Sequence, residues 1–124
     1  MTELSSSDIH FLVALLASEE ASASELKSLF DVWGVKPEIV KEIFVSLMKD
    51  GTIGVTNYID EKFIDITLEQ SLVLTENWLD FISSPYQIYL TDPGFKRWDI
   101  DDWGISTDRA KFLMFSNNGS AIHV

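Results

Sequence analysis

The period at which apolar residues recur changes at Gly51, and this change restricts the fold more than any other feature of the chain. Before Gly51, apolar residues recur every three or four positions, as on a helix with one buried face. After Gly51 they alternate with polar residues, as in a strand that is buried on one side. A chain that places helices before strands in this way is expected to adopt an α+β fold.

The first helix is expected to begin at residues 5–8, because serine and aspartate side chains cap helix N-termini. Its apolar face is formed by Ile9, Leu12, Val13 and Leu16. These four positions have the i, i+3, i+4, i+7 spacing of an amphipathic helix.

Two further helices are expected before Gly51. Ser22 and Glu25 have the spacing of a capping box, and Gly34 suits the left-handed cap that would end this second helix. Pro37 suits the first position of the third helix. The two apolar faces consist of Leu26, Leu29, Phe30 and Trp33, and of Val40, Ile43, Phe44 and Leu47. Because the linkers are only a few residues long, the three helices must pack as neighbours.

A β-hairpin is expected after the third helix. Residues 52–56 and 62–68 alternate between apolar and polar side chains, and the polar residues 57–61 between them are typical of a turn. A further strand is expected at residues 86–91. Together these predictions describe a three-helix core followed by a β-hairpin and additional short strands.

Short helices and a turn are expected in the rest of the chain. Thr75 can cap a short helix over residues 76–83, which Pro85 would end. The strings LVLTENWLDF and IYLTDPGFKRW share an apolar-x-Leu-Thr-acid opening, and each is interpreted as a strand-to-helix junction. Residues 112–124 fit either a hairpin with an Asn-Gly turn or a helix that ends at Gly119, and the hairpin is slightly favoured.

The order of three short helices and a hairpin resembles the winged-helix domains of the helix-turn-helix superfamily over residues 8–98. The string KDGTIGV leads from the third helix into the first strand, and IYLTDPGFKRW closes the sheet. Bacterial regulators of this family often have a similar ending, which is matched here by Leu90, Thr91, Gly94, Arg97 and Trp98. Residues 1–124 are then expected to form one domain, with an insertion at residues 69–85 and a C-terminal extension at residues 99–124.

The resemblance implies DNA binding through the third helix, so a winged-helix transcription regulator is the alternative function. In such domains this helix enters the major groove, and the hairpin wing touches the DNA backbone. The side chains expected to contact DNA are Lys41, Ser46 and Lys49. The wing opposes this function, because Asp60 and Glu61 at its tip would repel phosphates. Nucleic acid is therefore the less favoured partner.

The formal net charge of −11 favours a basic protein as the partner. The chain has 20 acidic residues against 9 basic ones, and a negative field of this kind repels nucleic acid while it attracts basic proteins. We therefore expect a non-enzymatic, acidic protein-binding module, such as an inhibitor or immunity protein that neutralises a basic nuclease-type toxin or another nucleic-acid-binding protein. The residues expected to bind this partner are Asp60, Glu61, Asp65, Trp98, Asp99, Asp101, Asp102 and Trp103.

Catalytic, cofactor and metal sites are not expected. His10 and His123 are the two histidines and lie far apart, and the Asp99–Asp102 segment lacks the remaining ligands of a calcium loop. No glycine-rich phosphate loop is present, since the six glycines are scattered singly. The chain has no cysteine, no basic leader and no long apolar segment, so a cytoplasmic location without membrane contact is expected. The aromatic residues near the C-terminus also allow a homodimer or an assembly subunit.

Overall fold

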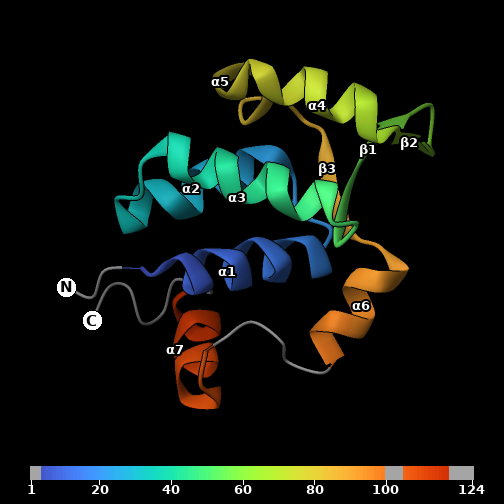
Figure 1. Cartoon of the computed structure of the whole chain (residues 1–124). Coiled ribbons are helices and arrows are strands. Elements are labelled where there is room, and N and C mark those ends of the chain that lie inside the picture. The colour runs from blue at the N-terminus through green and yellow to red at the C-terminus, as the bar shows by residue number, and fades with distance from the viewer. Residues whose placement is uncertain (1–3, 100–104, 118–124) are drawn as a thin grey trace.

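The computed structural model describes residues 4–99 and 105–117. Within these residues, three N-terminal helices precede an antiparallel sheet of three strands, and short helices flank the third strand (Figure 1). The elements are α1 (Ser6–Ser18), α2 (Ala23–Trp33), α3 (Pro37–Lys49), β1 (Ile53–Ile59), β2 (Lys62–Ile66), α4 (Leu68–Glu76), α5 (Trp78–Phe81), β3 (Gln87–Leu90), α6 (Asp92–Asp99) and α7 (Thr107–Asn117). This order confirms the predicted α+β class and is compatible with a winged-helix-like fold.

Helix α1 is buried around almost its whole circumference. Phe11 to Ala17 are all buried, because α1 lies between α3 and α7 and also contacts β3 (Figure 1). The predicted cap is confirmed as a capping box, in which the Asp8 backbone N–H donates to Ser5 Oγ at 3.1 Å and the Ser5 N–H donates to Asp8 Oδ2 at 2.9 Å. The helix therefore begins with its first amide groups satisfied.

The predicted ends of α2 and α3 are confirmed, with one exception. Gly34 caps α2 with a left-handed backbone at φ +70°, and Pro37 occupies the first turn of α3. The capping box predicted at Ser22 is wrong, because the Ser22 side chain accepts no backbone N–H. Ser22 Oγ instead forms a hydrogen bond with Ser24 Oγ at 2.9 Å, so this hydroxyl already has a partner.

The sheet has the strand order β2-β1-β3. Val55 of β1 and Ile88 of β3 lie opposite each other and are fully buried, so this face of the sheet covers the core. Strand β1 runs to Ile59, which lies opposite Lys62 in β2. The predicted turn at residues 57–61 is therefore shorter in the structure, where only two residues separate the strands.

The segment after β2 differs from the prediction. Helix α4 already begins after Thr67, which forms a capping box with Gln70, and α5 follows. The helix predicted over residues 76–83 is confirmed in part, as α5, whereas the strand predicted in LVLTENWLDF is wrong because these residues belong to α4 and α5. Thr75 does not cap a helix. It is a buried residue in the last turn of α4, and its hydroxyl donates to the Leu72 carbonyl at 3.0 Å.

The packing of α5 explains why this segment is helical. Its Trp78 and Phe81 rings each lie 5.4 Å from the Phe44 ring of α3, measured between ring centroids. All three rings are buried, so burial of the two aromatic side chains against α3 stabilises a helical α4–α5 segment. Helix α4 consequently lies beside α3, on the side away from α1 (Figure 1).

The second predicted strand-to-helix junction is confirmed, between β3 and α6. Thr91 Oγ1 accepts the Gly94 N–H at 3.1 Å and donates to the backbone carbonyl oxygens of Gly51 and Thr52. The Arg97 guanidinium lies 3.2 Å from both Asp50 Oδ2 and Thr52 Oγ1. The start of α6 is thereby fixed to the connection between α3 and β1.

The hairpin favoured for the C-terminal segment is wrong within the described residues, which form helix α7. Arg109 in the first turns of α7 binds Asp8 of α1 through two hydrogen bonds, Nε to Oδ1 at 3.2 Å and Nη2 to Oδ2 at 2.8 Å. Asp8 is 4% exposed, so its carboxylate is largely removed from water, while the Arg109 side chain remains partly exposed. Leu113 is fully buried in the same interface, and Phe112 contacts the Trp33 ring edge-on. The helical form is thus stabilised by contacts with distant residues; the predicted Asn-Gly turn lies outside the described residues.

Replacing Gly94 by alanine should lower the free energy of unfolding by about 2 kcal/mol. A Cβ at this position would lie 2.0 Å from the Thr52 carbonyl oxygen, so the junction between β3 and α6 would have to shift. Urea unfolding of Gly94→Ala should show this loss, whereas Lys96→Ala on the exposed part of the same helix should be nearly neutral. Equal stability of the two variants would contradict the close approach.

Replacing Arg109 by methionine should lower the free energy of unfolding at pH 7 by about 3 kcal/mol, because it leaves the buried Asp8 carboxylate without its guanidinium. Burial opposes ionisation of Asp8, but the hydrogen bonds from Arg109 and Ser5 outweigh it and hold the pKa of Asp8 below 3.8. A lowered pKa stabilises the folded state above pH 3.8, and this stabilisation is lost as the pH falls through the folded-state pKa. The stability difference between wild type and variant should therefore shrink in acid, while Lys111→Met remains close to wild type throughout.

Candidate functional site

The β1–β2 hairpin extends past the end of α3, next to the start of α4 (Figure 1). Strand β2 lies at the edge of the sheet and pairs with β1 alone among the described residues. Its residues 62–65 are all exposed. An exposed edge strand presents free backbone donors and acceptors, so this part of the molecule is open to a partner.

Two acidic residues form the tip of this hairpin in an unusual backbone conformation. Asp60 and Glu61 both have positive φ angles, of 51° and 63°, and they connect Ile59 to the opposite residue Lys62. A two-residue connection with positive φ at both positions is the type I′ turn, for which Asn-Gly is preferred. A glutamate in the left-handed region is strained, so the local backbone does not account for the choice of this residue.

Large apolar side chains surround the acidic tip. Tyr58 and Phe63 lie opposite each other with ring centroids 4.8 Å apart, and they are 53% and 57% exposed. Ile59 and Ile64 are also exposed and lie on the other face of the hairpin. Exposed apolar side chains grouped in this way are a common feature of interaction surfaces. We call these four residues together with Asp60, Glu61 and Asp65 the hairpin surface.

Asp65 of the hairpin surface lies on the same outer face of the sheet as Tyr89 of β3. Its negative charge lies near Tyr89 of β3, whose pKa is raised above 10.0 chiefly by burial and further by the charge of Asp65. The Tyr89 ring crosses over Gly54 of β1, where a Cβ would lie 2.6 Å from Tyr89 Cζ and Oη. Gly54 therefore allows this ring to lie close against the strand that separates it from β2.

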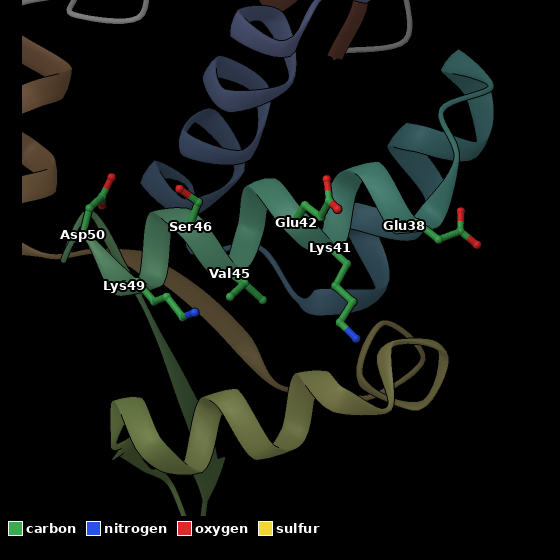
Figure 2. Close-up of a pocket in the computed structure, with 7 residues that line it drawn as sticks. All are labelled: Glu38, Lys41, Glu42, Val45, Ser46, Lys49 and Asp50. Carbon is green, nitrogen blue, oxygen red and sulfur yellow. The ribbon is translucent and has the colours of Figure 1, made fainter.

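The side chains predicted to contact DNA lie on the exposed face of α3. Lys41, Ser46 and Lys49 belong to a surface hollow of about 800 Å³ (Figure 2). The full lining of this hollow is Glu38, Lys41, Glu42, Val45, Ser46, Lys49 and Asp50. Three carboxylates thus accompany two ammonium groups, and the face is not basic.

Neighbouring elements also restrict access to the exposed face of α3. Figure 2 shows α4 running beside α3, with Lys41 and Val45 on the side toward α4. The Lys41 Nζ donates to the backbone carbonyl of Glu76, at 3.4 Å, at the negative end of the α4 dipole. Asp50 is paired with Arg97 of α6. A helix flanked in this way presents a narrower face to a DNA groove than an isolated recognition helix does.

The predicted protein-binding residues separate into two groups. Asp60, Glu61 and Asp65 lie together on the hairpin, and none of them belongs to an ion pair with another described residue. Trp98 and Asp99 are in the last turn of α6, but their side chains are not described. The remaining predicted residues, Asp101, Asp102 and Trp103, lie outside the described residues.

The aromatic side chains of the hairpin surface were not among the residues predicted from the sequence to bind a partner. Tyr58 was assigned to a polar turn. Phe63 was assigned to a strand, but not to either face of that strand. The alternation in Lys62–Ile66 carried a usable signal, because Phe63 and Asp65 fall on the face opposite to Ile64 and Ile66. A strand that is apolar on both faces, in a sheet with helices on one side, must expose one of those faces.

Replacing Asp65 by asparagine should lower the pKa of Tyr89 toward 10.0, because it removes the negative charge that disfavours the phenolate. The pKa should remain above 10.0, since burial is the larger cause of the shift. Ultraviolet titration of the variant, with Tyr89→Phe to assign the transition, measures the change. The raised pKa stabilises the fold below pH 10.0, and this stabilisation is lost as the pH rises through the folded-state pKa; an identical Tyr89 titration in wild type and variant would contradict the proximity.

The described residues contain no cluster of histidine, aspartate and glutamate side chains that could hold a metal ion. Across residues 4–99 and 105–117, no helix is long and apolar enough to cross a membrane. No family model, curated protein or solved structure matches the chain.

Proposed function

We propose that the protein is a non-enzymatic, acidic binding module whose hairpin surface docks on a basic protein. The observation that carries this proposal is the turn at Asp60 and Glu61. Two carboxylates occupy positions where Asn-Gly would relieve backbone strain, and exposed apolar side chains surround them. Strain retained at an exposed acidic tip is consistent with a role of the two carboxylates in binding.

The charge distribution supports a basic partner. The net charge of −11 attracts cationic proteins over long distances and raises their association rate. At short range, the apolar side chains of the hairpin surface would supply the buried contact area that charges alone do not provide.

A nucleic-acid-binding protein is the class of partner that fits this chemistry best. Proteins that bind phosphate backbones concentrate lysine and arginine on one surface, and a nuclease-type toxin is one example. Carboxylates that cover such a surface prevent phosphates from reaching it. The protein would then act as an inhibitor or immunity protein of that partner.

DNA binding by α3 is supported less well. The winged-helix-like order of elements places α3 where a recognition helix would lie, but fold alone does not determine function. Lys41 already donates to α4, and three carboxylates share the face with Lys41 and Lys49. These charges would reduce the counterion release that gives DNA binding its affinity.

The double variant Asp60→Asn, Glu61→Gly tests the proposed function because it should have opposite effects on stability and binding. The free energy of unfolding should rise by about 1 kcal/mol, since Asn-Gly is preferred in this turn. The association rate with the partner should fall about tenfold at low salt, since two steering charges are lost. A photo-crosslinking amino acid at position 63 in the native host captures the partner, and stopped-flow kinetics then compares purified wild type and variant.

The matched control is Lys41→Ala, Lys49→Ala on α3. This variant should not lose association rate with the captured protein, since it removes positive rather than negative charge. A captured protein that is acidic, or an association rate unchanged by loss of Asp60 and Glu61, would contradict the proposed function. Binding of duplex DNA at physiological salt that the control variant abolishes would favour the transcription regulator instead.

A further inference from the structure

We propose that the outer face of the sheet is a receptor for an arginine side chain of the basic partner, with Asp65 as its carboxylate and aromatic rings on either side. This inference rests on the proposed function and specifies its chemistry. The residues that form the receptor are Thr56, Tyr58, Phe63, Asp65 and Tyr89. Among the described residues, none of the contacts that hold the core together uses the Asp65 carboxylate.

The strand register places these side chains on one face. Asp65 lies opposite Thr56, and the next row on the same face toward the hairpin tip is Tyr58 opposite Phe63. On the other side of Thr56, the row consists of Gly54 opposite Tyr89. Aromatic rings therefore flank the Asp65–Thr56 row from both directions along the strands.

Gly54 brings the Tyr89 ring toward Asp65. Because residue 54 has no Cβ, the Tyr89 ring lies across β1, within 2.9 Å of the place that a Cβ would occupy. Strand β1 is the central strand, so this position directs the ring from β3 toward β2. The influence of Asp65 on the pKa of Tyr89 is consistent with this arrangement.

Two polar groups of the receptor are left without partners. The Asp65 carboxylate is exposed and makes no hydrogen bond or ion pair with the described residues. Thr56 is 6% exposed, and its buried Oγ1 has no hydrogen-bond partner within the described part of the chain. A buried hydroxyl is usually hydrogen-bonded. The exposed Asp65 carboxylate therefore remains available to a ligand that carries several N–H donors, opposite a buried hydroxyl that has no partner.

A guanidinium group matches this receptor better than other ligand groups do. It is planar, carries five N–H donors in a fork that fits a carboxylate, and stacks on aromatic rings. Anionic ligands are disfavoured by Asp65 and by the acidic tip at Asp60 and Glu61. The nearest lysine in the sequence, Lys62, falls on the opposite face of β2, so it does not neutralise Asp65 on this face.

A short acetylated peptide with one arginine among glycines and serines tests the receptor. Amide chemical shifts of the whole wild-type chain are recorded during titration with this peptide and with matched peptides that carry citrulline or lysine. The arginine peptide should shift residues 54, 56, 65 and 89. The citrulline peptide, which has the same shape without the charge, should bind at least about tenfold more weakly.

Two variants at exposed positions show whether the receptor itself binds the peptide. Asp65→Asn and Phe63→Ala should each weaken arginine binding, by about tenfold and about threefold, without change in circular dichroism. Glu20→Gln, a charge change in the exposed loop between α1 and α2, is the matched control and should leave binding unchanged. In wild type, the bound guanidinium should also lower the pKa of Tyr89, because it offsets the charge of Asp65.

Failure of the receptor is distinguishable from failure of the proposed function. Shifts confined to other acidic surfaces, equal binding by Asp65→Asn, or equal binding of the lysine peptide would each overturn the arginine receptor. The proposed function would stand if the captured partner were still basic and sensitive to Asp60 and Glu61. Conversely, arginine binding abolished by Asp65→Asn would support the receptor even if the partner captured through position 63 proved acidic.

Discussion

Helix α1 is apolar on almost every side, and the remaining elements must cover it from every direction. Such a helix is stable in water only when other elements enclose it. Helices α2 and α3, strand β3 and helix α7 supply that cover, and the buried core extends from Ile9 to Leu113. The pair between Asp8 and Arg109 fixes α7 against the first turn of α1. Its cost of burial is offset by two direct hydrogen bonds and by the capping box at Ser5.

Unlike α1, the hairpin is largely exposed to solvent beyond its base. Its base contributes Val55 to the core, but beyond Asn57 no described helix covers the outer face, and Tyr58 and Phe63 remain exposed. Rigid attachment of the base and exposure of the tip together present acidic and aromatic side chains on a fixed support. A binding surface of this kind loses little conformational entropy on association, because its backbone is already ordered.

Local signals predicted the first half of the fold well and the second half poorly. The caps at Ser5 and Gly34 and the helical period up to Gly51 depend on residues within one or two turns of each other, and these predictions are confirmed. Helix α4 was missed although Thr67 and Gln70 have the spacing of a capping box, and the helix predicted over residues 76–83 is present only in part, as α5 packed on Phe44. For the C-terminal segment the helix was the less favoured alternative, because its Arg109 binds a residue 101 positions earlier in the chain.

By itself, the sequence determined the sign of the charge, the order of the first three helices and the hairpin, and the presence of acidic residues at the hairpin tip. These properties follow from composition and from short periods, which no tertiary contact alters. Only the tertiary structure decided that the end of the hairpin is exposed on both faces, and that Tyr89 of β3 lies near Asp65 of β2. The physical reason is that exposure and electrostatic proximity are set by elements distant in sequence, here β3 and α4, which no local pattern in β1 or β2 can specify.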